Sequence, residues 1–258
     1  MRLTSLVLSL LIAIFIPFAG TAQKKRIKLF DGNNLDHWYV YIAGKGKNND
    51  PDKVFTIHNK MIRISGEEYG CLTTNDEFEE YVLKARFKWG DKTWGERKDK
   101  ARDCGILLHS VGADGAWGNT WLYSIEYQMI EGATGDYWVL GDDSKNYAIS
   151  CNVKNAAHEG YVYEPGGRVV TIHKGRIDSR FKDPEWKDIK GFRGRKQIEK
   201  RHGKWNRIKI VVRDGQIWNY LNGKLVNHAF DVKPLKGKIQ LQSEMAEVFF
   251  GKVRLRKL

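Results

Sequence analysis

The chain has 258 residues, of which 41% are hydrophobic and 12% aromatic, and its formal net charge is +13. This composition excludes a disordered chain and supplies enough apolar side chains to bury a sizeable core. The charge alone would suit a nucleic-acid binder, but the chain carries no nucleic-acid-binding signature. We therefore expect no nucleic-acid partner.

The first residues form a short apolar segment behind one positive charge. Arg2 precedes the apolar run 6–18, which is shorter than the roughly 20 residues that cross a bilayer as a helix. Gly20 and Ala22 occupy the −3 and −1 positions of a small-residue cleavage site. We expect residues 1–22 to be a signal peptide that is cleaved after Ala22. The mature protein would then be exported, periplasmic or secreted, without a membrane anchor, as a single domain over residues 23–258.

Three cysteines are present, at Cys71, Cys104 and Cys151. Their odd number and irregular spacing exclude a disulfide framework and a zinc knuckle. One bridge remains open in an oxidising compartment, with no pairing indicated by the sequence.

The first strong pattern along the chain is an alternation of period two. In EYVLKARFKW, Tyr81, Leu83 and Phe87 fall on one face, and Lys84 and Arg86 fall on the other. Such alternation is typical of a strand with one face on a core. Long helical periodicity is absent from the chain.

The same pattern recurs toward the C-terminus. RIKIVVR is separated from QIWNYL by Asp214-Gly215, and QIWNYL from KLV by Asn222-Gly223. Both dipeptides tolerate positive φ and favour hairpin turns. KIQLQS and EVFFGKVRL predict two further strands. The chain is therefore expected to be all-β, a two-sheet antiparallel jelly-roll sandwich.

Two charged segments interrupt the strands. Residues 90–103 and 175–204 lack clear periodicity and are expected to form long surface loops that rim a cleft, with room for a short helix in 183–200. Between Lys174 and Lys209 there are fourteen Lys or Arg against five acids. This excess indicates either a solvated basic loop or an edge that receives an anionic ligand.

The stretch SIEYQMIEG at 124–132 is a strand with an unusual polar face. Glu126 and Gln128 share one face, with their α-carbons about 6.5–7 Å apart, whereas Glu131 falls on the apolar face. A bulge between Met129 and Gly132 would turn Glu131 to the polar face, and bulges occur preferentially near active sites. The stretch is thus either a solvated strand face or a working site.

Neighbouring segments supply further candidates for a site. His109 ends the apolar run CGILLHS, Arg102 lies shortly before it, and the glycine-rich loops carry Trp121, Tyr137 and Trp138. Carboxylates and imidazoles transfer protons or bind hard cations, and aromatic rings suit the apolar faces of sugars. Purely structural roles for His109 and the tryptophans stay open. Phosphate-binding loops, a nucleophile elbow and an H-E-x-x-H motif are all absent.

Several stretches occur together and in order over nearly the whole of residues 23–258. They are LFDGNNLDHW, EFEEYVLKARFKW, ARDCGILLHS, WLYSIEYQMIEGATGDYW, GKWNRIKIVV, LNGKLVNHA and GKIQLQSEMAEVFFGKVRLRKL. With them the chain resembles the family first described as domain of unknown function 1080 and later as 3-keto-disaccharide hydrolases, or 3-keto-glycoside lyases and hydratases. Met245 departs from the pattern, since glycine is usual there.

The resemblance implies a concanavalin A-like jelly roll that holds an oligosaccharide or glycoside on its concave sheet. By the family pattern the site contains His109, Glu126, Gln128 and Glu131, with Arg102, Asp136 and Glu244 on nearby segments. The predicted catalytic residues are Glu126, His109 and Glu131. The predicted substrate-binding residues are Arg102, Gln128, Trp121, Asp136, Tyr137, Trp138 and Glu244.

The implied chemistry begins with a ketone at C3 of the sugar, which acidifies the hydrogen on C2. Glu126 or His109 would remove this proton, Glu131 would act as acid or metal ligand, and Gln128 would orient a hydroxyl. Arg102 or a divalent metal ion would stabilise the oxyanion. No cofactor is certain from the sequence, and the divalent ion is the one candidate.

Two alternatives remain beside this chemistry. E-x-Q-x-x-E is similar to the E-x-D-x-x-E strand of retaining β-glucanases, in which the first Glu is the nucleophile and the last is the acid/base, about 5–5.5 Å apart. A non-catalytic carbohydrate-binding module would use the same aromatic residues, because fold does not settle function.

Overall fold

The computed structural model describes residues 25–156 and 160–258, so the predicted signal peptide lies outside the described residues. Strands dominate this part of the chain, and its only helical element is the single 3-10 turn η1 (Gly95–Arg97). Over the same residues, no helix is long and apolar enough to cross a membrane.

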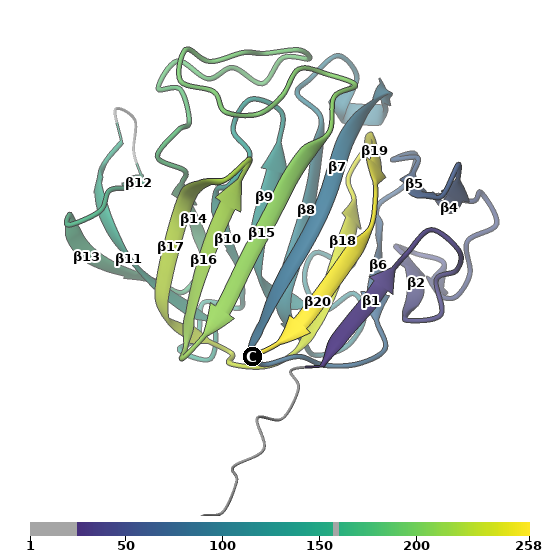
Figure 1. Ribbon diagram of the computed structural model, residues 1–258, viewed down its shortest axis with the longest axis horizontal. Helices are drawn as coiled ribbons and strands as arrows, with labels where there is room; N and C mark the ends of the chain where they lie inside the picture. The colour runs from purple at the N-terminus through teal and green to yellow at the C-terminus, as the bar shows by residue number, and fades with distance from the viewer. Residues whose placement is uncertain (1–24, 157–159) are drawn as a thin grey trace, which may run out of the picture.

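The strands form two sheets packed face to face (Figure 1). Sheet A contains β1 (Arg26–Phe30), β4 (Phe55–His58), β5 (Met61–Ile64), β7 (Tyr81–Thr93), β15 (Asn206–Arg213), β16 (Gln216–Leu221), β17 (Lys224–Lys233), β19 (Ala246–Phe250) and β20 (Val253–Lys257). Sheet B contains β2 (Trp38–Ile42), β3 (Gly46–Lys47), β6 (Gly70–Thr74), β8 (Asp103–Val111), β9 (Tyr123–Ile130), β10 (Tyr137–Leu140), β11 (Ala148–Asn155), β12 (Tyr161–Tyr163), β13 (Arg168–Ile172), β14 (Gly175–Asp178) and β18 (Lys238–Ser243). Among the described residues, every strand pair is antiparallel except β12 with β14.

The long strand β7 lies at the centre of sheet A. It pairs with β15 along one edge, and along the other edge first with β20 and then with β19. In sheet B the order runs from β2 through β6, β18, β8, β9 and β10 to β14. β17 joins the sheets, because it pairs with β16 in sheet A and with β11 in sheet B.

The core lies between the sheets and follows the alternation in the sequence. In β7 the side chains of Tyr81, Leu83 and Phe87 are buried, whereas those of Lys84 and Arg86 are exposed. The inner side chains of β8, β9 and β18 pack against them from sheet B. The prediction of an all-β jelly-roll sandwich is confirmed.

Both predicted hairpin turns are present between strands of sheet A. Asp214 and Gly215 connect β15 to β16 with φ of 50° and 67°, and Asn222 and Gly223 connect β16 to β17 with φ of 50° and 86°. Two successive positive φ values match the right-handed twist of the paired strands.

The charged segments are only partly loops. β7 runs on to Thr93, so the first segment is shorter than predicted, and β14 occupies the start of the second. The expected helix within 183–200 is wrong, because this stretch forms turns and bends. The three cysteines are all buried and free, so the bridge left open by the sequence is absent.

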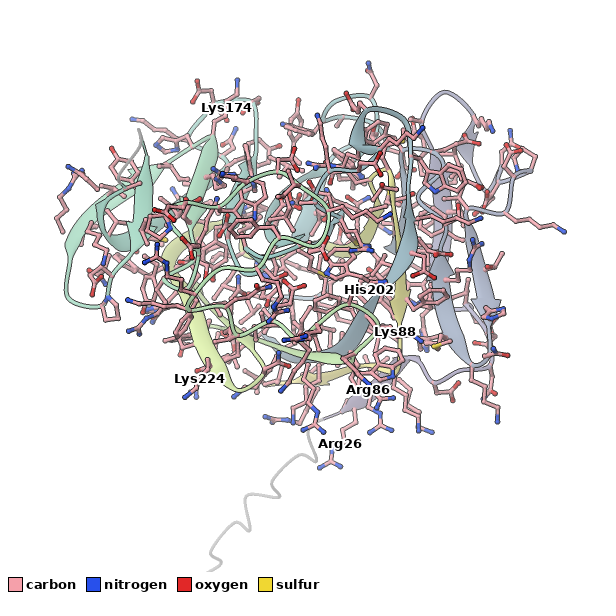
Figure 2. The ribbon with its side chains drawn as sticks, turned by 90° about the horizontal axis from the view of Figure 1, so that it is seen from above. Arg26, Arg86, Lys88, Lys174, His202 and Lys224 are labelled. Carbon is pink, nitrogen blue, oxygen red and sulfur yellow. The ribbon has the colours of Figure 1, made fainter. Side chains whose placement is uncertain are left out.

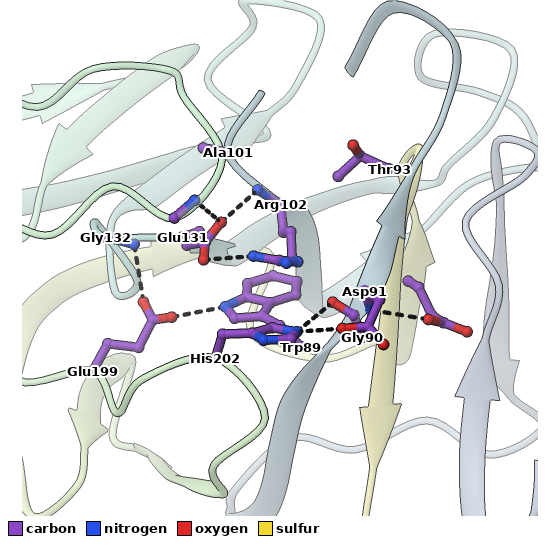
Figure 3. A network of polar contacts seen from close by, with 12 residues as sticks. Trp89, Gly90, Asp91, Thr93, Ala101, Arg102, Glu131, Gly132, Glu199 and His202 are labelled. Carbon is purple, nitrogen blue, oxygen red and sulfur yellow. Dashed lines mark hydrogen bonds and ion pairs between the residues drawn. The ribbon is translucent and has the colours of Figure 1, made fainter. Parts of the chain in front are cut away.

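The second charged segment crosses the top of the sandwich (Figure 1), and the carboxyl of Glu199 anchors it there (Figure 3). This carboxyl accepts hydrogen bonds from Trp89 Nε1 at 2.7 Å, Thr134 Oγ1 at 2.8 Å and the Gly132 amide at 3.2 Å. Burial raises the pKa of Glu199 to about 7 despite these donors. The loop is thereby held to the core through a carboxyl that titrates near neutrality.

We expect Glu199→Gln to flatten the pH dependence of stability. The folded-state pKa lies above the ordinary value of 4.5, so the folded protein binds this proton more tightly and loses stability as pH rises from about 4.5 to about 7. The loss should reach about 3 kcal/mol at most and should be missing from the variant. Urea unfolding of both proteins at pH 5 and pH 8 measures this difference. If the free energy of unfolding changes equally between pH 5 and pH 8 in both proteins, the pKa shift does not belong to Glu199.

Candidate functional site

The outer face of sheet B, which points away from the core, carries the polar residues of β8, β9 and β18. The register places Glu126 opposite Leu107 and Gln128 opposite Gly105. Leu107 in turn lies opposite Gln240 of β18, and Gln242 follows two residues later on the same face. Since Gly105 has no side chain, neighbouring side chains can come close to its α-carbon in the middle of this face.

Two side-chain oxygens occupy the space above Gly105. A β-carbon on Gly105 would lie 2.1 Å from Glu126 Oε1 and 2.2 Å from Gln242 Oε1. Both oxygens are buried without a hydrogen-bond partner. A buried acceptor without a donor costs free energy, and such groups mark sites where a donor is missing. The pair is therefore suited to receive a proton or the hydroxyls of a ligand.

Glu126 belongs to a group of three neighbouring carboxyls, which also contains Asp103 and Glu244 and is called the carboxyl group below. Asp103 forms an ion pair with Arg97 and accepts hydrogen bonds from Gln128 Nε2 and, at 3.0 Å, from the Cys104 amide. Burial raises the pKa of Asp103 to about 7, and Arg97 opposes this shift. A carboxyl with this pKa can hold or release a proton near neutral pH.

Glu126 and Glu244 are the other two carboxyls of the group. Burial raises the pKa of both well above the ordinary range, and in Glu126 the charge of Glu244 adds to the shift. Glu126 is 4% exposed and Glu244 is only partly buried. Neighbouring acids repel one another's charge, so these carboxyls do not all ionise together near neutral pH.

Aromatic rings border the carboxyl group on the same face. Trp138 of β10 lies directly opposite Glu126 and is half-buried. Trp121 is stacked on Trp117 with ring centroids 5.7 Å apart, and its indole donates to the Gly70 carbonyl at 3.1 Å. Of these rings, Trp138 is the one placed to contact a ligand bound at Glu126.

Beyond Trp138 the outer face continues into a cavity of about 440 Å³ that β11, β12, β14 and the second charged segment line. Arg176 of β14 pairs with Trp138 and covers its ring at 5.4 Å. The carboxyl group and this cavity thus lie on one continuous side of sheet B.

His109 does not join the carboxyl group. The β8 register shifts between Leu108 and Val111, and His109 adopts φ of 50° at this bulge. Its ring nitrogens lie 2.7 Å from the Pro234 carbonyl and 3.2 Å from the Glu79 carbonyl. Its ring packs edge-on against Tyr81 of the core, and burial lowers its pKa. The bulge therefore turns His109 away from Glu126.

Glu131 is also turned away, and the predicted bulge before Gly132 is wrong. The β8–β9 register is regular through Ile130, which leaves Glu131 on the side opposite Glu126. There it forms an ion pair with Arg102 at 2.6 Å and accepts the Gly191 amide at 3.0 Å (Figure 3). Both side chains are buried, so this pair holds the second charged segment rather than a ligand of Glu126.

Asp136 and Tyr137 also have partners inside the protein. Asp136 is fully buried, accepts the Ser179 amide at 2.7 Å and pairs with Lys182 at 3.1 Å, and burial raises its pKa to about 6. Tyr137 lies in the core and donates to the Ile217 carbonyl at 2.7 Å. Asp136 supports the wall of the cavity beyond Trp138, whereas the prediction that Tyr137 contacts substrate is wrong.

The sequence analysis missed two residues that contact the carboxyl group, Gln242 and Arg97. Gln242 could have been found, since it alternates with Ile239 and Leu241 in KIQLQS as Glu126 alternates with Ile125 and Tyr127 in β9. Arg97 had no such signal, because it lies in η1 and reaches Asp103 only through the fold. Over the described residues, no group of three or more His, Cys, Asp or Glu could hold a metal ion.

Met245 occupies a position at which glycine is usual in the family pattern described in the sequence analysis. It adopts φ of 55° in the turn between β18 and β19, a conformation that side chains disfavour. The backbone at this point therefore has a conformation that glycine adopts without strain, and the neighbouring Glu244 follows directly after β18.

We expect Gly105→Ala to destabilise the fold by about 1–3 kcal/mol, because the added methyl overlaps both buried oxygens. Alanine for glycine in a strand interior would otherwise be stabilising. The same substitution in a Gln242→Ala background should cost less, since one of the two overlaps is then removed. Thermal or urea unfolding of the four proteins in this cycle gives the coupling, and additive effects would show that the oxygens do not meet over Gly105.

Comparison with known proteins agrees with this architecture. A crystal structure from Parabacteroides distasonis, described as a putative glycosyl hydrolase, is 16% identical with a TM-score of 0.53, covering 90% of this chain and 94% of its own. A second structure with that description and source is 18% identical with a TM-score of 0.51, covering 91% and 100%. At these identities the likeness shows the fold alone. Among proteins with curated descriptions, none matches the sequence.

A match to a family of carbohydrate-related domains extends over almost the whole described chain. The match runs over residues 25–256, from the start of sheet A to the last residues of β20, and so includes the carboxyl group and Trp138. The chain belongs to the family of 3-keto-alpha-glucoside-1,2-lyase-like domains.

Proposed function

We propose that this protein cleaves 3-keto-glycosides by elimination and then hydrates the product. The observation that carries the proposal is the pair of buried, unpartnered oxygens of Glu126 and Gln242 above Gly105, beside carboxyls that retain a proton. Sugar hydroxyls are donors that would satisfy both oxygens. The family of the chain supports a ligand with a keto group at C3.

In the first step, the ketone makes the C2 hydrogen acidic and Glu126, in its ionised form, removes that proton. A buried carboxylate with a raised pKa is a stronger base than an exposed one. The electron pair of the C2–H bond forms an enediolate over C2 and C3. Arg97 supplies positive charge near the site through its contact with Asp103.

In the second step the enediolate collapses. The C3 ketone re-forms, a double bond develops between C1 and C2, and the C1–oxygen bond breaks. Glu244 gives its proton to the departing oxygen. Of the two carboxyls it is the more exposed, so the leaving group can depart toward solvent. Water then adds across the double bond, its oxygen to C1 and a proton to C2, to give the free 3-keto sugar.

Gln128, Gln242 and Trp138 would position the sugar. The amide of Gln128 is fixed by Asp103, and the oxygen of Gln242 has no other partner. Trp138 lies directly across the strand pair from Glu126 and would contact the sugar with the part of its ring that Arg176 leaves uncovered. The described residues do not fit a metal ion, because their carboxyls and histidines form no ligand group, and each step above uses side chains of the protein alone.

The geometry disfavours the retaining-glycosidase alternative. That mechanism needs two carboxyls about 5–5.5 Å apart on one ligand, whereas Glu131 lies on the other side of β9 and pairs with Arg102. A binding module would need no carboxyls with raised pKa values, and these favour an enzyme. Together with the signal peptide proposed from the sequence, this function would operate outside the cytoplasm.

We expect Glu126→Gln to lower turnover of a 3-keto-glucoside at least about a hundredfold while the thermal midpoint stays nearly unchanged. Glutamine has the shape of the protonated acid that the raised pKa favours, but it cannot accept the C2 proton. Glu131→Gln is the matched control, since it should lower the thermal midpoint and leave the turnover of the remaining folded protein close to wild type.

A substrate panel separates the alternatives. The purified protein is incubated with a 3-keto-glucoside and with an unoxidised β-glucan, and the release of aglycone or reducing sugar is followed. Turnover of the keto compound alone supports elimination, and turnover of the glucan would establish a glycosidase. If the protein binds glycans but turns over neither compound, both enzyme functions are ruled out and the protein is a carbohydrate-binding module.

A further inference from the structure

The outer face of sheet A carries cations directly opposite one another on neighbouring strands. Arg86 of β7 lies opposite Arg207 of β15, and Lys84 of β7 lies opposite Lys209 of β15 on one side and Arg254 of β20 on the other. All five side chains are exposed. The pattern continues to the edge of the sheet, where Arg26 pairs with Arg256.

These cations have no acidic partners among the residues that the structure describes, since none of them takes part in an ion pair there. They surround a shallow groove of about 510 Å³ that is lined by Lys84, Ala85, Arg86, Arg207, Ile208, Lys209, Gly223, Lys252 and Arg254. Six of these nine residues are cationic and none is acidic, so the groove is strongly positive.

This arrangement is unfavourable for the isolated fold. Like charges directly opposite on neighbouring strands are destabilising, and acids at alternate positions would remove the repulsion. Protection of a sheet edge does not explain the cations, because β7 is the central strand and already has partners on both sides. The charges are explained if an anionic partner covers this face.

Aromatic rings support the cations along the groove. Arg86 and Lys88 lie over the ring of Trp205 at 5.0 Å and 5.4 Å, and Lys209 lies over the ring of Tyr220 at 4.4 Å. Contact with a ring restrains a long side chain and leaves its charge free for an anion. Arg86, Lys88 and Arg26 lie along one side of the molecule, and Lys174 lies on the opposite side (Figure 2).

We propose that the outer face of sheet A binds an acidic polysaccharide through carboxylate or sulfate groups repeated along the chain. Guanidinium groups bind such anions in a bidentate manner, and fixed rows of cations suit a polymer with repeated charge. The proposal rests on the carbohydrate-related family of the chain and not on the elimination chemistry. The face is separated from the carboxyl group by the full thickness of the sandwich, so it would hold the polymer without occupying the reacting site.

A membrane surface is a weaker match to this face. The exposed large hydrophobic residues among those described are Ile57, Val169, Ile189 and Leu235, and none of them lines the groove. Insertion of apolar side chains into lipid is therefore not available here. The rings of Trp205 and Tyr220 lie beneath cations, which also makes them poor platforms for stacking nucleic-acid bases.

The test measures binding of the full mature chain to polygalacturonate and to heparin at 50 and 200 mM salt, with dextran as neutral polymer. We expect binding to both acidic polymers, none to dextran, and a marked loss at the higher salt concentration. Lys84→Glu combined with Lys209→Glu should weaken binding at least about tenfold. Lys174→Glu and Lys187→Glu together make the same charge change elsewhere and should weaken it less than about threefold.

A second readout separates this role from a structural one. Lys84→Glu alone should raise the thermal midpoint by about 1–4 °C, because it replaces repulsion by attraction toward Lys209 and Arg254, while it weakens polymer binding. Turnover of a small 3-keto-glucoside should not change, so loss of the proposed activity and loss of this surface are distinguishable. The proposal is overturned if neither acidic polymer binds, if the control pair weakens binding equally, or if duplex DNA or phosphatidylserine vesicles bind as tightly.

Discussion

The pairing of β8 with β9, which is regular from Asp103 to Leu108, is the constraint on which the candidate site depends. Because side chains alternate along a strand, this register decides that Glu126 and Gln128 face outward together and that Glu131 faces the other way. The absence of a side chain at Gly105 then allows Glu126 and Gln242 to approach from opposite sides. A slip of one residue would turn every one of these groups to the other face.

The residues just after β9 serve the architecture instead of the site. Glu131 accepts the Gly191 amide of the second charged segment, and Glu199 of that segment accepts the Gly132 amide just after β9. Arg102, the residue before β8, and Trp89 of β7 donate to these two carboxyls. Burying such carboxyls is costly unless donors surround them, and here backbone amides provide the donors. The loop that forms one wall of the cavity beyond Trp138 is thus positioned by the same strand that carries Glu126.

The two outer faces of the sandwich have opposite electrostatic character. Burial and mutual repulsion of acids keep protons on the sheet B face, whereas the sheet A face gathers cations with no acid between them. Each arrangement costs stability in the free protein and each would be relieved by a ligand of the complementary kind. The exposed cations of sheet A and the buried acids of sheet B are therefore gathered on opposite faces of the sandwich.

Sequence alone determined the fold class, the strands β7 to β9 and β15 to β18, and the position of Glu126 and Gln128 on one face, because these follow from local alternation and from turn dipeptides such as Asn222-Gly223. The stretch EVFFGKVRL, predicted as one strand, forms the two strands β19 and β20. The sequence motifs also placed the chain in a family that the match over residues 25–256 supports. The tertiary structure decided the rest. A bulge in β8 turned His109 toward Tyr81, a regular end to β9 turned Glu131 toward Arg102, and the fold brought Arg97 and Gln242 to Asp103 and Glu126. These outcomes depend on cross-strand register and on contacts between distant segments, which alternation within one segment does not specify.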